Sequence, residues 1–271
     1  MARIGASSRV LAVLGDPVAH SLSPAMHNAA IAVLGLDAVY VAFRVPAARL
    51  SEVLDACRTI RMSGNLTIPL KVAAVELVDQ TTGTAQRAGA VNTFWIDDGS
   101  MHGDNTDAAG VTDALAGLDA EAPWLLAGTG GTARAVAVAA ADCGASLIVR
   151  SREPERARGF AQWAGALGLS ATVDDGQPVR TAINTTPRGL AADDPLPIPM
   201  DRLHGATAAL DLVYRSGETA WVRACRAAGL RAADGRTVLV SQGARAFERF
   251  FPGAIAPRAV MAAAVRRALG D

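Results

Sequence analysis

Strand-like and helix-like patterns alternate along nearly the whole chain, and this alternation constrains the fold more than any single motif does. The segments that read as strands lie at 9–14, 39–45, 62–68, 124–127, 146–149, 180–184 and 206–212. Helical patterns follow most of these segments and also end the chain, at 240–250 and 257–269. Alternation of this kind is typical of an α/β fold with a mostly parallel sheet.

Local residue types place two helix starts and one hairpin. Ser23 and Pro24 predict a helix start, with the Ser23 hydroxyl as N-cap and Pro24 as the first helical residue. Asp107 is placed to cap another helix, which runs through Leu115. The segment 97–100, Asp-Asp-Gly-Ser, lies between two strand-like runs and predicts a hairpin turn.

The composition is that of a globular protein without charge bias. A chain of 271 residues fits one large or two medium domains, and 51% of its residues are apolar. The 26 basic residues equal the 26 acidic ones, so we expect no nucleic-acid partner. The three cysteines and four histidines have no metal-ligand spacing, and the apolar stretch near the N-terminus is too short for a signal peptide or membrane span. We therefore expect a soluble, cytoplasmic protein with no membrane partner and no metal.

A glycine-rich loop lies between a predicted strand and a predicted helix, which is the context of a dinucleotide-binding turn. Its residues are Gly128, Thr129, Gly130, Gly131, Thr132 and Ala133. Glycine at the first two key positions permits a tight turn and close approach of a pyrophosphate, and Ala133 is small enough for the helix to pack on the strand. The helix N-terminus then offers free N–H groups and a partial positive charge to phosphates. A purely structural turn is the alternative.

The end of the next strand favours NADP over NAD. An NAD site usually has Asp or Glu about 20 residues after the loop, bonded to the ribose 2′-hydroxyl. Here the strand ends in Arg150, Ser151 and Arg152, with Arg156 one helical turn further. Guanidinium groups at this position would suit a 2′-phosphate, although a solvated charged face is the alternative.

Three further polar clusters lie where strands end or helices begin. They are His20–Pro24 with two hydroxyls, Asn65–Lys71 with an amide, a hydroxyl and an ammonium, and Gly103–Asp107 with carboxylates and an amide. The two serines at a helix start suit a carboxylate ligand. Spacing alone leaves simple surface positions as an alternative for each.

Taken together, these segments resemble the shikimate dehydrogenase family. The matching pieces are Ser21–Pro24, Asn65–Lys71, Gly89–Thr93, Gly103–Asp107, the loop at Gly128, Asp211–Tyr214 and Gln242. They occur in the order and spacing of the family, which is far more specific than any one motif.

The resemblance implies a two-domain α/β protein. Residues 1–107, completed by C-terminal helices within 240–271, would form an α/β substrate-binding domain. Residues 108–239 would form a Rossmann-type, doubly wound NADP-binding domain, with the active site in the cleft between the two.

The resemblance also implies the reversible NADPH-dependent reduction of 3-dehydroshikimate to shikimate, with Lys71 and Asp107 as the catalytic pair. Ser21, Ser23 and Tyr214 would hold the substrate carboxylate. The residues that would bind the ring hydroxyls are Asn65, Thr67, Asn92, Asp107 and Gln242. The residues that would bind NADP are the loop residues 128–133, Arg150, Ser151, Arg152, Arg156, Asn184, Thr185 and Gly235.

The chain departs from the family pattern at three places. Glu153 brings a negative charge next to the expected 2′-phosphate site, and Arg150 and Arg156 would offset it. The segments 184–189 and 234–239 also differ near the expected nicotinamide end. A quinate or dual-specificity relative, with NAD or dual cofactor use, is the nearest alternative, although the intact Ser23 favours shikimate. A non-catalytic cofactor-binding module is disfavoured by the presence of Lys71 and Asp107, and monomer and homodimer both stay open.

Overall fold

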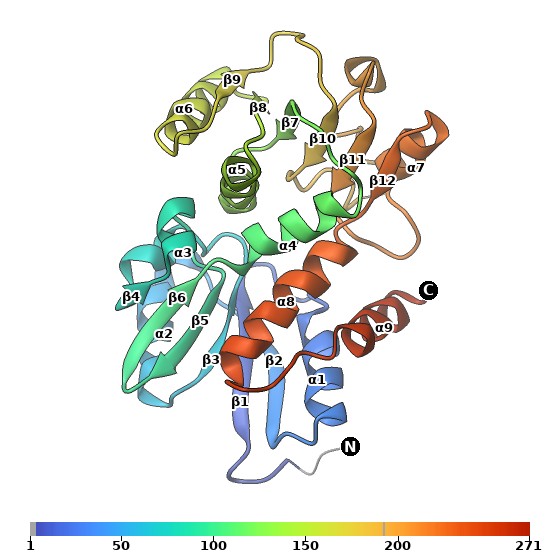
Figure 1. The fold of residues 1–271 in the computed structure, drawn as a ribbon. Helices are drawn as coiled ribbons and strands as arrows, with labels where there is room; N and C mark the ends of the chain where they lie inside the picture. Colours follow the sequence, from blue (N-terminus) through green and yellow to red (C-terminus); the bar gives the residue numbers. More distant parts are fainter. Residues whose placement is uncertain (1–3, 192) are drawn as a thin grey trace. The chain divides into compact units, whose positions relative to one another are not determined.

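The computed structural model describes residues 4–191 and 193–271 (Figure 1). The chain divides into two compact units, Met1–Asp107 with Leu239–Asp271, and Ala108–Val238. Each unit contains one six-stranded sheet, and the expected α/β fold class is confirmed.

The sheet of the first unit is mixed, with the strand order β2-β1-β3-β5-β6-β4. Its strands are β1 (Arg9–Gly15), β2 (Ala38–Arg44), β3 (Ser63–Leu66), β4 (Gln80–Thr81), β5 (Thr93–Asp97) and β6 (Ser100–Asp104). β2, β1 and β3 are parallel, whereas β5 runs antiparallel to both β3 and β6. The predicted hairpin is present: Asp98 and Gly99 have φ of 44° and 80°, as a tight two-residue turn requires.

Helices of both chain segments cover this sheet. They are α1 (Ser23–Val33), η1 (Ala47–Arg49), α2 (Leu50–Thr59), η2 (Ala73–Glu76), α3 (Gly83–Ala88), α8 (Arg236–Phe250) and α9 (Arg258–Leu269). The side chains of Leu14, Leu54 and Phe94 belong to one buried cluster, which joins α2 to the strands. α1 packs beside α9 (Figure 1), and a Cβ at Gly243 on α8 would lie 2.1 Å from Met26 Cε on α1. Glycine at that position therefore permits the close approach of the two helices.

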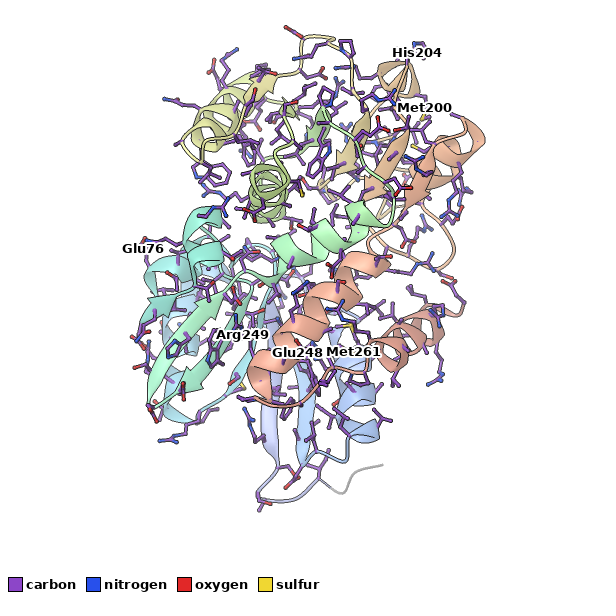
Figure 2. All side chains as sticks on the ribbon, viewed as in Figure 1. Glu76, Met200, His204, Glu248, Arg249 and Met261 are labelled. Carbon is purple, nitrogen blue, oxygen red and sulfur yellow. The ribbon has the colours of Figure 1, made fainter. Side chains whose placement is uncertain are left out.

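The end of α8 is fastened to the hairpin strands by Arg249, which Figure 2 labels beside Glu248. The Arg249 guanidinium donates to the buried Asp104 carboxylate at the end of β6 over 3.1 Å. It also lies over the Trp95 ring of β5, 5.3 Å from the ring centroid. These contacts tie a C-terminal helix to strands that lie far from it in the sequence.

The sheet of the second unit is entirely parallel, with the strand order β12-β11-β10-β7-β8-β9. Its strands are β7 (Trp124–Ala127), β8 (Leu147–Arg150), β9 (Ala171–Val173), β10 (Thr181–Asn184), β11 (Ala208–Asp211) and β12 (Arg231–Ala233). Starting from β9, the chain order of the six strands is 3-2-1-4-5-6, the order of a dinucleotide-binding Rossmann sheet. The order reverses between β7 and β10, where such sheets bind their ligands.

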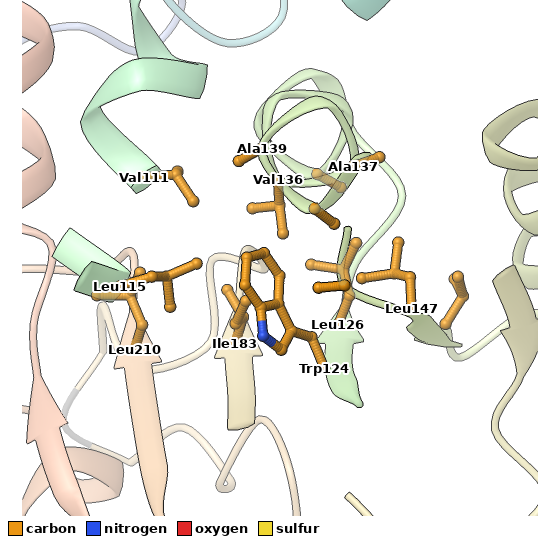
Figure 3. Packing of buried hydrophobic residues seen from close by; sticks show 14 of the residues in the cluster. Val111, Leu115, Trp124, Leu126, Val136, Ala137, Ala139, Leu147, Ile183 and Leu210 are labelled. Carbon is orange, nitrogen blue, oxygen red and sulfur yellow. The ribbon is translucent and has the colours of Figure 1, made fainter. Parts of the chain in front are cut away.

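Helices lie on both faces of this sheet. They are α4 (Thr106–Ala116), α5 (Gly131–Cys143), α6 (Pro154–Gly165), η3 (Met200–Leu203) and α7 (Ala220–Ala227), and α4 starts in the first unit. Figure 3 shows one face, where Val136 of α5 and Leu115 of α4 pack over Trp124, Ile183 and Leu210. On the other face, Trp221 of α7 belongs to a cluster with Leu125 and Ala209.

Some local expectations were wrong. The N-cap of α1 is Leu22, so Ser23 is already helical and its hydroxyl does not cap the helix. α4 begins at Thr106, so Asp107 lies in its first turn rather than at its cap. After β3, where the alternation of strands and helices favours a helix, the chain forms only the 3₁₀ turn η2. Within the described residues, no helix is long and apolar enough to cross a membrane.

Candidate active site

Lys71 and Asp107 form a close, largely buried ion pair in the first unit. Lys71 Nζ lies 2.6 Å from Asp107 Oδ2, and the two side chains are 12% and 9% exposed. The fully buried Leu70 anchors the segment after β3, and the Lys71 carbonyl accepts from Val91 N over 2.8 Å. Asp107 is presented by the first turn of α4. An ammonium held this close to a carboxylate is oriented by it and can act in proton transfer.

Asn92 is the centre of the hydrogen-bond network that holds Asp107. Its Nδ2 donates to Asp107 Oδ1 over 2.7 Å, so both oxygens of Asp107 are engaged. Its Oδ1 accepts from Thr106 N over 2.8 Å, which fixes the orientation of the amide. Gln242 Oε1 on α8 accepts from the same Nδ2 over 3.3 Å. The α8 helix therefore contributes directly to the surroundings of the pair.

Asn65 at the end of β3 is held by a second layer of hydrogen bonds. Its Nδ2 donates to Thr93 Oγ1 over 2.9 Å and to the Asn92 carbonyl over 3.1 Å. The Tyr40 hydroxyl of β2 donates to Asn65 Oδ1 over 2.7 Å. Burial raises the pKa of Tyr40 well above its ordinary value, so this hydroxyl keeps its proton and remains a donor. Asn65, Asn92 and the pair thus form one connected polar cluster.

Ser21, Ser23 and Thr67 follow the carboxyl ends of two neighbouring parallel strands. Ser21 Oγ accepts from Ser23 N over 3.3 Å, so the two serines lie together at the start of α1. Thr67 N donates to the Leu14 carbonyl over 2.9 Å, which fastens this segment to the end of β1. A Cβ at Gly15 would lie 2.3 Å from Thr67 Cγ2, so glycine leaves the room that Thr67 occupies.

In the second unit, the glycine-rich loop joins the end of β7 to the start of α5. Gly128 has a φ of 112°, and a Cβ there would lie 2.4 Å from Thr185 Oγ1. Thr185 itself donates to the Ala127 carbonyl over 2.8 Å, which keeps it against the loop. Gly130 is the N-cap of α5, and a Cβ there would meet nothing within 4 Å. The loop therefore has a fixed first glycine and open space at the helix N-terminus, which fits a pyrophosphate.

Arg150 and Arg156, which were expected near the 2′-phosphate, each have a carboxylate partner. Arg150 donates to Asp174 Oδ2 over 2.7 Å, and Arg202 donates to Asp174 Oδ1 over 2.8 Å. Burial alone would raise the pKa of Asp174, but the hydrogen bonds from Arg202 and Arg150 outweigh it and leave the pKa lowered. Arg156 Nε lies 2.8 Å from Glu153 Oε2, one turn earlier on the chain. Arg152 is exposed next to Ser151 at the start of this turn.

Tyr214 and Gly235 lie against each other in the second unit. A Cβ at Gly235 would be 3.2 Å from Tyr214 Cδ1 and 2.2 Å from the Leu212 carbonyl oxygen. Gly235 N also donates to the Val213 carbonyl over 3.1 Å. Asn184 at the end of β10 donates to Asp211 at the end of β11 over 2.8 Å. The second unit therefore gathers the glycine-rich loop, Asn184, Thr185 and Tyr214 at the carboxyl ends of its strands.

Sequence reasoning overlooked several residues that support these groups. Thr93 and Thr106 share hydrogen bonds with Asn92, and both lie inside the motif segments, although no role was predicted for either. Tyr40 and Asp174 have no such local signal. Among residues 4–191 and 193–271, no group of three or more His, Cys, Asp or Glu side chains is arranged to hold a metal ion.

The second unit has a parallel sheet in Rossmann order with a glycine-rich loop, and the first unit has a buried Lys–Asp pair. These are the features of a dinucleotide-dependent dehydrogenase. A family model described as the shikimate dehydrogenase substrate binding domain matches residues 13–94. A shikimate dehydrogenase (NADP(+)) of Thermus thermophilus is 41% identical over 262 residues, which cover 96% of this chain and 98% of that protein. The chain belongs to the shikimate dehydrogenase family, as its motifs predicted.

Solved structures agree with this assignment. Shikimate 5-dehydrogenase from Thermus thermophilus, in complex with NADP(H) and shikimate, matches with a TM-score of 0.87 and 39% identity over 96% of this chain and 100% of that one. The ligand-free 5-ketofructose reductase of Gluconobacter sp. strain CHM43 matches with a TM-score of 0.85 and 27% identity over 97% of this chain and 100% of that one. The same fold therefore also occurs in a reductase whose name gives a different ketone, 5-ketofructose, as its substrate.

Proposed function

We propose that this chain is an NADP-dependent shikimate dehydrogenase, which reversibly reduces 3-dehydroshikimate to shikimate in the biosynthesis of chorismate and aromatic amino acids. The observation that carries the proposal is the 2.6 Å contact of Lys71 and Asp107 inside a network of amides and hydroxyls. A family relative named as an NADP enzyme covers nearly the whole chain.

Lys71 and Asp107 carry the proton chemistry. NADPH, when bound, supplies the hydride that reduces the ketone. The Lys71 ammonium stabilises the negative charge that develops on the substrate oxygen and donates a proton to it. Asp107, fixed by Lys71 on one oxygen and by Asn92 on the other, holds the Lys71 ammonium in position. In the reverse direction the pair accepts the proton of the substrate hydroxyl.

The remaining polar residues bind the substrate. Ser21 and Ser23 hold the carboxylate, and the family resemblance names Tyr214 as a further residue for it. Asn65, Thr67, Asn92, Asp107 and Gln242 bind the ring hydroxyls, and their number suits a substrate made almost entirely of polar groups. A site built from buried polar groups rejects analogues that lack a hydroxyl, since its own donors and acceptors would be left unpaired.

The cofactor residues fit NADP. The open N-terminus of α5 and the loop residues Gly128–Ala133 would hold the pyrophosphate, and Asn184, Thr185 and Gly235 the nicotinamide end. Arg152, with Ser151, would hold the 2′-phosphate. Arg150 and Arg156 would add positive charge nearby, although each is partly neutralised by its carboxylate partner.

The second candidate function is the reduction of a different substrate, as in a relative of the same family. Glu153 weakens the case for strict NADP use, and a relative named for 5-ketofructose has the same fold. Quinate or NAD use would keep the fold and the Lys71–Asp107 chemistry. We also propose a cytoplasmic location, which the free thiols of Cys57, Cys143 and Cys225 support.

The test is nicotinamide reduction by the purified protein, with shikimate and with quinate, each paired with NADP and with NAD. Reduction of 5-ketofructose with NADPH serves as the third substrate arm. We expect the highest kcat/KM with shikimate and NADP. Preference for quinate, NAD or 5-ketofructose would move the protein to that activity, and no turnover by a folded protein that binds NADPH would contradict a catalytic function.

A further inference from the structure

Asp211 is a fully buried carboxylate that neither the proton chemistry nor ligand binding uses. It ends β11, at the carboxyl edge of the parallel sheet where such folds bind their ligands. Burying a carboxylate is unfavourable unless its oxygens find hydrogen-bond donors. The Asp211 carboxylate therefore depends on hydrogen-bond donors in its surroundings.

Three uncharged donors from three segments converge on the Asp211 carboxylate. Asn184 Nδ2, from the end of β10, donates to Oδ1 over 2.8 Å, and Val213 N donates to the same oxygen over 3.1 Å. Thr219 Oγ1, at the N-cap of α7, donates to Oδ2 over 2.7 Å. Because Thr219 Oγ1 accepts from Val222 N, its own proton is free for Asp211. Both oxygens therefore act as acceptors, as an ionised carboxylate requires.

Two of these segments carry residues of the proposed site. Asn184 Oδ1 accepts from Thr186 N over 2.9 Å, so the bond to Asp211 also orients the loop that contains Thr185. Val213 directly precedes Tyr214, and Gly235 closes on this stretch from the other side through its bond to the Val213 carbonyl. Burial, the largest influence on Asp211, raises its pKa, while the hydrogen bonds from Thr219 and Asn184 oppose that rise.

We propose that Asp211 is a positioning residue, whose carboxylate fastens the Asn184–Thr185 loop to the loop that carries Tyr214. The proposal rests on the proposed function, since it takes Asn184 and Thr185 as cofactor residues and Tyr214 as a substrate residue. Asp211 acts through its hydrogen bonds and touches neither ligand. An uncharged residue of the same shape would fill the same space, but only a carboxylate accepts hydrogen bonds from all three donors at once.

The direct test is Asp211→Asn, which keeps the shape but turns one acceptor into a donor that faces other donors. Three quantities are measured: the Kd of NADPH from nicotinamide fluorescence, the KM of shikimate, and the Tm. We expect the NADPH Kd and the shikimate KM each to rise about tenfold, because small misplacements of binding groups cost about that much or more.

Two threonines provide a matched pair for the same question. Thr219→Val removes the hydrogen bond to Asp211. Thr181 is equally buried but lies at the other end of β10 from Asn184, and Thr181→Val removes its hydrogen bond to the Glu121 carbonyl. We expect Thr219→Val to raise the NADPH Kd and the shikimate KM about threefold, as loss of one hydrogen bond would. Thr181→Val should lower the Tm while leaving both constants within about twofold.

The outcomes separate this inference from the proposed function. Wild-type protein that binds NADPH but does not oxidise shikimate overturns the proposed function, and the NADPH Kd of the variants still tests Asp211. Folded Asp211→Asn protein with an unchanged NADPH Kd and an unchanged shikimate KM overturns the positioning role. If Asp211→Asn does not fold, equal effects of Thr219→Val and Thr181→Val on the two constants overturn it instead.

Discussion

Asp107 divides its two carboxylate oxygens between Lys71 Nζ at 2.6 Å and Asn92 Nδ2 at 2.7 Å. The carboxylate is thereby fixed in position, and through it the ammonium of Lys71 is fixed as well. Preorganisation of this kind is what allows charges in an active site to stabilise a transition state without rearranging first. The pair is accordingly the most direct place to test the proposed chemistry.

Lys71→Ala should abolish most of the turnover and leave shikimate affinity comparatively intact. General acid catalysis by a positioned group contributes about 10²–10⁴-fold, so kcat should fall by about that factor. The measurement is kcat, together with the Kd of shikimate from equilibrium binding. Arg158→Ala removes the cation of an exposed pair with Glu155 and serves as the control. Near-normal kcat in folded Lys71→Ala protein would exclude the proposed role of Lys71.

Ser21→Ala should raise the KM of shikimate more than it lowers kcat. Contacts with the substrate carboxylate are made equally in the ground state and in the transition state, so their loss weakens binding rather than the chemical step. Loss of one hydrogen bond to a charged group predicts a KM increase of about tenfold. Ser7→Ala, which removes an exposed bond to Asp37, is the control. A fall confined to kcat would require a different role for Ser21.

The second unit could be predicted well from the sequence, for a physical reason. Parallel strands buried on both faces read as apolar runs, and β7, β8 and β11 have this pattern over most of their length. In β10 the apolar residues are Ala182 and Ile183. β9 and β12 were not predicted, because each has three residues and none or one of them is buried. Edge strands this short have no periodicity that could be recognised.

The first unit was harder to predict because strand pairing depends on tertiary contacts. The apolar pattern of β5 resembles that of the parallel strands, and only the turn at Asp98 and Gly99 indicates that it reverses direction. The N-cap assignment of Ser23 was wrong because serine is common at that position and Leu22 is not. Residue type is a weak guide there, since α1 is held mainly by its buried contacts.

The residues of the candidate site could be predicted from the sequence, but the contacts that join them into a network could not. Lys71 and Asp107 were paired through the family resemblance, and the structure brings them to 2.6 Å. The partnership of Arg150 with Asp174 could not be predicted, because 24 residues separate them and their contact depends on β8 and β9 lying side by side. Residues that join a site through tertiary contacts leave no signal in local spacing.

Glu153→Gln should increase the preference for NADP over NAD. Arg156 and Glu153 are 66% and 62% exposed, and an exposed pair of this kind is weak. Removing the carboxylate frees Arg156 and removes repulsion of the 2′-phosphate, so the ratio of kcat/KM for NADP to that for NAD should rise about threefold to tenfold. Glu155→Gln is the control, because it removes the carboxylate partner of Arg158, one turn further along α6 than Glu155. Equal changes with both cofactors would place Glu153 outside the 2′-phosphate site.

His27 should make the fold sensitive to mild acid. Its imidazole is fully buried, stacks on Tyr40 with ring centroids 4.3 Å apart and packs beside Phe247 and Phe250. Within the described residues, neither ring nitrogen has a hydrogen-bond partner. Burial therefore lowers the pKa of His27 from 6.5 to about 3 in the folded state. The unfolded chain binds the proton at its ordinary pKa, so stability is highest above that pKa and falls as the pH drops from 6.5 toward 3.

His27→Phe should remove this sensitivity, because phenylalanine keeps a stacking ring and does not titrate. Near pH 5 the wild-type protein should have lost roughly 2 kcal/mol of its free energy of unfolding through His27 alone, relative to neutral pH. The check is denaturant unfolding of both proteins at neutral pH and near pH 5. The acid-induced loss should be smaller in His27→Phe by about that amount. His204→Phe controls for loss of an exposed histidine, and an identical acid response of His27→Phe and wild type would show that the buried imidazole does not set the acid stability.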